Sequence, residues 1–119
     1  MDTADVLELA RRFPDVVLRE GPAWTSITFK GRGFGWVRHE ENTAQLKTTH
    51  AERTALLATD PTTYAEGWAS GSTAWVLVQL AAADPDEVLE LLAEGWRMTA
   101  TKKVVAAFDA AHRGGLPTA

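Results

Sequence analysis

Four short segments between residues 16 and 48 constrain the fold of this chain most. Each is rich in β-branched and aromatic residues, and turn-forming pairs such as Gly21-Pro22 and Gly31-Arg32 separate them. The expected strands are Val16–Glu20, Trp24–Lys30, Gly33–Arg38 and Thr43–Thr48. Because connections this short join antiparallel neighbours, the pattern predicts a meander of antiparallel strands.

Helical patterns lie on both sides of this block. Apolar residues recur every three or four positions from Thr3 to Phe13, which is the period of an amphipathic helix, and Pro14 ends it. Further helices are expected to start at three capping signals, which are Thr49 with Glu52, Asp84 with Pro85, and Thr101.

The remaining segments complete the expected topology. Ala74 to Leu80 is apolar at nearly every position, which predicts a central strand covered on both faces, whereas Asp60 to Ser72 is expected to form a loop. Gly114-Gly115 should end the last helix. We therefore expect one α+β domain over residues 1–113, an antiparallel sheet covered by helices on one face, and a flexible tail over residues 114–119.

The composition excludes several classes of protein. A chain of 119 residues can bury a core without disulfides, and with no cysteine it has neither disulfides nor zinc–thiolate sites. The net charge of −4, from 16 acidic and 12 basic residues, does not favour non-specific nucleic-acid binding. The acidic N-terminus lacks a signal-peptide pattern, and no apolar run is long enough to span a bilayer, so a cytoplasmic protein without membrane contact is expected.

The order of these motifs resembles the MmcQ/YjbR family over nearly the whole chain. The front half carries Phe13-Pro14-Asp15-Val16, Gly21-Pro22-Ala23-Trp24 and the segment from Ile27 to Phe34. The back half carries the passage from Trp75 to Arg97 and the closing segment from Ala100 to Asp109. The resemblance implies a compact CyaY-like (frataxin-like) fold and DNA binding through a double-wing arrangement of hairpins. The chain departs from many relatives in its short stretch between Asp60 and Ser72 and in its glycine-rich Gly33-Phe34-Gly35-Trp36.

Basic residues on and beside the expected turns are the candidates for a nucleic-acid contact. The predicted set is Lys30, Arg32, Arg38, Lys47, Lys102 and Lys103. Such side chains contact phosphate and position a protein on nucleic acid. The alternative is structural: lysines at a sheet edge oppose aggregation, and Lys102 and Lys103 can lay their stems over apolar surface.

Five tryptophans suggest a second kind of site. Trp75 and Trp96 lie on strongly apolar segments and are expected in the core, and Trp24 and Trp36 are expected to form cross-strand pairs. Trp68, in a glycine-flanked segment with Tyr64, is a candidate anchor that would form, with the aromatic face of the sheet, a site for a protein or small ligand. The alternative is that Trp68 folds back as a lid on the core.

No motif indicates an enzyme, a metal site or a cofactor. His39, His50 and His112 lack a metal-ligand spacing, and no serine lies in a nucleophile-elbow context. The prediction is a non-enzymatic binding domain without cofactor. Its partner is DNA on the basic residues or, as the alternative, a protein or small ligand at Trp68.

Overall fold

The computed structural model describes residues 1–112 and 116–117 of the chain. The elements in chain order are α1 (Thr3–Ala10), β1 (Val16–Glu20), β2 (Thr25–Phe29), β3 (Arg32–Arg38), β4 (Thr43–Thr49), α2 (His50–Thr59), β5 (Tyr64–Ser70), β6 (Thr73–Gln79), a 3₁₀ turn η1 (Leu80–Ala82), α3 (Pro85–Thr99) and α4 (Lys102–Ala111). Of the expected tail, the structure describes Leu116, which packs against the core, and Pro117, which is buried. The expected helix end at Gly114-Gly115 lies outside the described residues.

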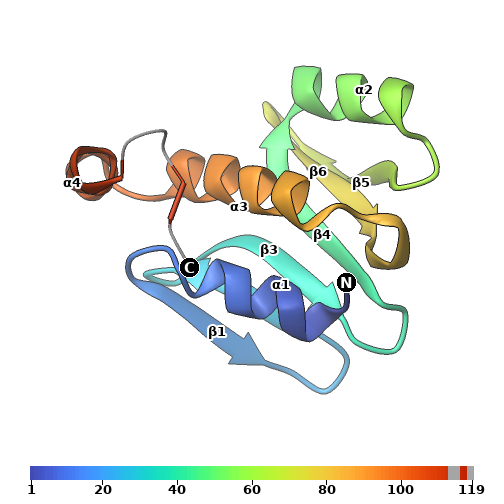
Figure 1. The fold of residues 1–119 in the computed structure, drawn as a ribbon, viewed down its shortest axis with the longest axis horizontal. Coiled ribbons are helices and arrows are strands. Elements are labelled where there is room, and N and C mark those ends of the chain that lie inside the picture. Colours follow the sequence, from blue (N-terminus) through green and yellow to red (C-terminus); the bar gives the residue numbers. More distant parts are fainter. Residues whose placement is uncertain (113–115, 118–119) are drawn as a thin grey trace.

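The strands form one antiparallel sheet in the order β1-β2-β3-β4-β6-β5. β6 has a neighbour on each side and is a central strand as expected, but helices cover only one of its faces, so the expected cover on both faces is wrong. In Figure 1, α3 crosses the sheet between α1 and α2, and α4 lies beyond the C-terminal end of α3. Because α1, α2 and α3 cover one face, the expected α+β architecture is confirmed, and the opposite face of the sheet is left open.

Strand alternation divides residues between these two faces. Val37, Ala44, Val78 and Tyr64 lie side by side in register across β3, β4, β6 and β5, and all are buried beneath the helices. Their chain neighbours Trp36, Gln45 and Leu77 are equally in register and point to the open face. The sheet therefore has a helix-covered face and an open face, which we name by these terms below.

The helix starts are built by the expected caps. The side chains of Thr49, Asp84 and Thr101 each accept a hydrogen bond from a backbone N–H in the first turn of their helix. In α1, Asp2 and Asp5 form a reciprocal capping box. This helix ends at Ala10 rather than at Phe13, because the next turn tightens into i→i+3 bonds, from Arg12 N to Leu9 O and from Phe13 N to Ala10 O.

One predicted segment is wrong. Residues 64–70, expected within a loop, form the edge strand β5, which pairs with β6 and turns into it at Gly71, where φ is +58°. A bulge between Glu66 and Ala69 interrupts the pairing. The segment lacks strand character in sequence because alanine, glycine and serine replace β-branched residues, and the pairing with β6 supplies its order instead.

Candidate functional site

Four of the five tryptophans converge on the open face of the sheet. Trp24 precedes β2, Trp36 lies on β3, Trp75 on β6 and Trp68 on β5. The ring centroids of Trp36 and Trp75 are 4.7 Å apart, and those of Trp75 and Trp68 are 6.3 Å apart. These spacings are those of interacting aromatic pairs. We call the surface formed by these four indoles the tryptophan face.

The two ends of the tryptophan face are accessible. Trp68 is 58% exposed and Trp24 is 46% exposed, whereas Trp75, between its neighbours, is only 6% exposed. The indole N–H of Trp75 is buried and has no acceptor within the described part of the chain. A partner would therefore meet the outer rings first, supported from below by a buried central indole.

A shallow pocket opens at one end of this face. It has a volume of about 350 Å³ and is lined by Trp24, Trp36 and Arg38. The Arg38 guanidinium lies 5.8 Å from the centroid of the Trp24 ring, within cation–π distance. Arg38 also forms a surface ion pair with Glu41, with 3.5 Å between Nη1 and Oε1, and such exposed pairs contribute little. Two ring faces and a guanidinium suit a planar group that carries or adjoins a negative charge.

The bulge in β5 positions Trp68, and hydrogen bonds from both sides of the sheet hold the backbone of the bulge. On the open face, the Gln45 side chain reaches across β6 and its Oε1 accepts the backbone N–H of Trp68 at 3.1 Å. From the other side, Arg53 of α2 donates to the carbonyls of Gly67, at 3.3 Å, and Trp75, at 3.4 Å. Any side chain at Gly67 would collide there, since a Cβ would lie 2.6 Å from both Gln45 Oε1 and Trp75 O.

The charged strand residues of the open face are basic. Arg19 lies in register with Ser26 and Trp36, and Arg38 follows Trp36 on the same side of β3. Lys47 pairs with Trp75 and is the third cation in register with this face. Within the described strands, no aspartate or glutamate occupies an open-face position.

Lys47 nevertheless directs its ammonium elsewhere. The pairing of β3 with β4 ends at Gly35 and Leu46, and Lys47 Nζ donates to Thr99 Oγ1 of α3 at 3.1 Å. Burial, and then the nearby charge of Arg32, lowers the pKa of Lys47 from its usual value. Lys47 therefore ties the sheet to α3 at this end of the molecule.

The structure does not gather the six predicted basic residues into one patch. Arg32 and Lys47 lie near one another, but Arg38 is at the opposite end of β3, roughly 20 Å away along a strand of this length. Lys30 is exposed in the two-residue turn between β2 and β3. Lys102 and Lys103 are exposed in the first turn of α4.

Tyr64 and Trp68, predicted as one ligand site, lie on opposite faces. Tyr64 is 2% exposed and belongs to the helix-covered core, whereas Trp68 packs on Trp75 at the open face. Trp68 is therefore not a lid on the core.

Trp96 is buried in the core as expected, with Nε1 donating to Pro14 O at 3.1 Å. Trp75 is also buried, but beneath Trp36 and Trp68 rather than in the core that was expected to hold it.

Sequence reasoning missed Arg19 and assigned Trp75 to the core, although it joined the aromatic face of the sheet to the Trp68 segment. Strand alternation alone places Trp36 and Arg38 on one side of β3, so the sequence could have indicated that these two side chains share a surface. The position of β6 beside β4, which brings Trp75 to Trp36, is a long-range pairing with no local signature.

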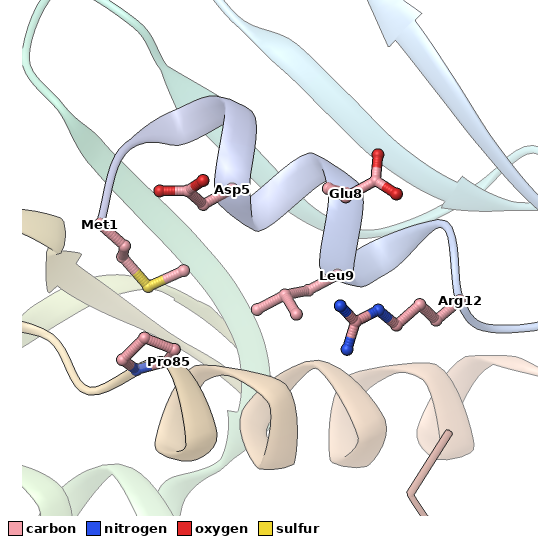
Figure 2. Close-up of a pocket in the computed structure, with 6 residues that line it drawn as sticks. All are labelled: Met1, Asp5, Glu8, Leu9, Arg12 and Pro85. Carbon is pink, nitrogen blue, oxygen red and sulfur yellow. The ribbon is translucent and has the colours of Figure 1, made fainter. Parts of the chain in front are cut away.

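Another pocket, of about 410 Å³, lies between α1 and the start of α3. Figure 2 shows Met1, Leu9 and Pro85 directed into it, with Arg12 at one end and Glu8 pointing away. Asp5 belongs to the capping box, and Glu8 lies 3.8 Å from Arg11. Because these carboxylates already have local partners, they do not form an acidic site in this pocket.

Two further classes of site are absent from the described residues. The described residues contain no group of three His, Asp or Glu side chains placed to hold a metal ion. No helix among them has the length and apolar character needed to cross a bilayer.

Comparisons with known proteins place the chain in a family. The sequence model of the YjbR family matches residues 11–98. Protein DR2400 of Deinococcus radiodurans, described by its DUF419 domain, has the same fold, with a TM-score of 0.74 at 17% identity over 99% of this chain and 97% of that one. No curated protein matches the sequence. Because the match runs from the end of α1 through nearly all of α3, it confirms the resemblance inferred from sequence, and the chain belongs to the YjbR family.

Proposed function

We propose that this protein is a non-enzymatic binding domain that takes single-stranded nucleic acid on its tryptophan face. The observation that carries the proposal is the row of four indoles on an open sheet face whose charged strand residues are basic. Bases stack on aromatic side chains with about 1–3 kcal/mol per base and little sequence preference, and Arg side chains attract the phosphates.

The geometry of the tryptophan face favours unpaired bases over a duplex. Stacking requires free ring faces on the nucleic acid, which a single strand has and a duplex hides. The pocket of Trp24, Trp36 and Arg38 offers both a ring surface and a cation to one nucleotide. Duplex binding through hairpin wings, which the family resemblance suggests, would instead use Lys30 and Arg32 at the β2–β3 turn.

The test is fluorescence anisotropy of labelled single-stranded DNA, single-stranded RNA and duplex DNA at low and then physiological salt. We expect both single strands to bind more tightly than the duplex, with affinity that falls as salt rises. Tryptophan fluorescence should be quenched in the same titration, because bases stack on the indoles. Preference for the duplex, or no binding at low salt, would overturn the proposal.

Substitutions on the tryptophan face sharpen the test. Trp68→Ala should weaken single-strand binding about 5- to 150-fold, the loss expected for one stacked base. Met98→Ala is the matched control, because Met98 is also an exposed large apolar residue but lies on α3. Arg38→Gln should weaken binding and flatten the salt dependence, and Arg11→Gln, at the C-cap of α1, is its control. Equal effects of site and control variants would contradict the assignment of this face.

A further inference from the structure

An acidic crevice lies on the other side of the sheet, between α2 and α3. Its volume is about 180 Å³, and its walls carry the carboxylates of Glu52 from α2 and of Glu87, Glu90 and Glu94 from α3. No basic residue is among those that line it, and none of the four glutamates forms an ion pair with a described residue. Glu94 accepts one hydrogen bond, from Thr48 Oγ1 at 3.0 Å.

Repulsion among these carboxylates destabilises the folded protein when no ligand is bound. Glu87, Glu90 and Glu94 are three and four positions apart and therefore lie along one stripe of α3. Like charges at this spacing destabilise a helix, and Glu52 adds a fourth negative charge from across the crevice. A cation held among them would relieve this repulsion.

Tyr64 supplies an independent sign of a missing ligand. Its side chain lines the crevice from β5 and is 2% exposed, and its hydroxyl has no hydrogen-bond partner in the described part of the chain. Burial, and then the charge of Glu87 with smaller contributions from Asp60, Asp84 and Glu52, raises the pKa of Tyr64 to about 12. The group is a neutral phenol whose hydroxyl lies just beneath the surface of the crevice, where it can accept a hydrogen bond from a bound cation once the overlying side chains move aside.

The lining indicates the kind of cation. The described carboxylates form no group that could hold a metal ion. Leu56 and Leu91 add apolar surface to the crevice, so a cation carried on a carbon chain fits better than a bare or hydrated ion. A primary ammonium has three hydrogens to donate, enough to contact two carboxylates and the Tyr64 hydroxyl.

We propose that the crevice between α2 and α3 binds an amino-alkyl group, a primary ammonium on a short unbranched carbon chain. This chemistry occurs in free diamines and polyamines and in the side chain of lysine. The proposal is independent of the tryptophan face, because the crevice lies on the helix-covered face of the sheet.

Calorimetric titration of the protein with cadaverine, with a lysine blocked at both backbone ends, with pentanol and with magnesium chloride at matched ionic strength tests this chemistry. The amines should bind, and the uncharged alcohol and the metal ion should not. Tighter binding of cadaverine would assign the site to a free diamine, and tighter binding of the blocked lysine would assign it to a peptide side chain. Binding of magnesium as strong as that of the amines, or no amine binding, would overturn the proposal.

Variants locate the bound amine. Glu87→Gln combined with Glu90→Gln should weaken amine binding about tenfold or more, because charge-assisted hydrogen bonds are lost. Glu20→Gln combined with Glu40→Gln makes the same charge change at exposed positions outside the crevice and should have little effect. An equal loss of amine affinity in the two double variants would mean that binding depends only on the net charge of the protein, which would contradict the crevice as the site.

Tyr64→Phe provides a second readout that does not depend on the glutamates. Without amine, this variant should be as stable as the wild type or more so, since the removed hydroxyl has no partner. With cadaverine, the rise in melting temperature should be smaller than in the wild type. A rise equal to that of the wild type would contradict contact between the amine and Tyr64.

Discussion

At the scale of single residues, Tyr64 gives the fold a measurable dependence on alkaline pH. It is the only tyrosine in the sequence, so its titration can be followed without overlap from another phenol. Its pKa is raised to about 12 in the folded protein, whereas a tyrosine in an unfolded chain has a pKa of about 10. Above the lower value, the unfolded chain loses the proton that the folded chain retains.

The sign of the effect follows from this difference in bound protons. The stability that neutral Tyr64 contributes is fully present below about pH 10 and is lost as the pH rises through about 12, by about 2–3 kcal/mol. Chemical denaturation at successive pH values should show this fall in the wild type and a shallower one in Tyr64→Phe. Parallel curves for the two proteins would show that Tyr64 is not protected from ionisation.

At the scale of elements, a helix or strand could be predicted from sequence when the contacts that form it join residues close together in the chain. The starts of α2, α3 and α4 could be predicted because a capping side chain and the N–H that it satisfies lie within three residues. β5 could not, because its order comes from pairing with β6 and from contacts of Gln45 and Arg53, which are distant in sequence. For the same reason, Trp68 and an aromatic sheet face were candidates from sequence, but the contacts of Trp75 with Trp68 and with Trp36 were not predicted.

The bulge of β5 should be intolerant of a side chain at Gly67. A Cβ there would lie 2.6 Å from the Trp75 carbonyl oxygen and 2.9 Å from its carbon, which are backbone atoms and cannot rotate away. Gly67→Ala should therefore reduce the free energy of unfolding by about 1–3 kcal/mol, the cost typical of overpacking. Denaturant unfolding measures this change.

Gly33→Ala is the matched control for the bulge. Gly33 lies on β3, and a Cβ there would meet no atom within 4 Å. This variant should have stability close to that of the wild type. If the two variants lost equal stability, the effect would come from glycine removal in general rather than from the close approach of β5 to β6.

At the scale of the whole molecule, the net charge of −4 conceals a separation of charge between two faces. The acidic crevice belongs to the helix-covered face, whereas the charged open-face residues of the described strands are basic. A negative total therefore does not exclude an anionic partner, because attraction at short range depends on the charges of the contacted face and salt screens the more distant ones.

This separation predicts that the two proposed sites act independently. Tyr64 and Glu87 lie on the helix-covered side of the sheet, while Trp68 and Arg38 lie on its open side, so the sheet itself stands between the two sets. Effects of substitutions at separated sites without shared partners usually add. Tyr64→Phe should leave single-strand affinity unchanged, and Tyr64→Phe with Trp68→Ala should bind nucleic acid as weakly as Trp68→Ala alone. A further loss in the double variant would show that β5, which carries both residues, transmits changes from one face of the sheet to the other.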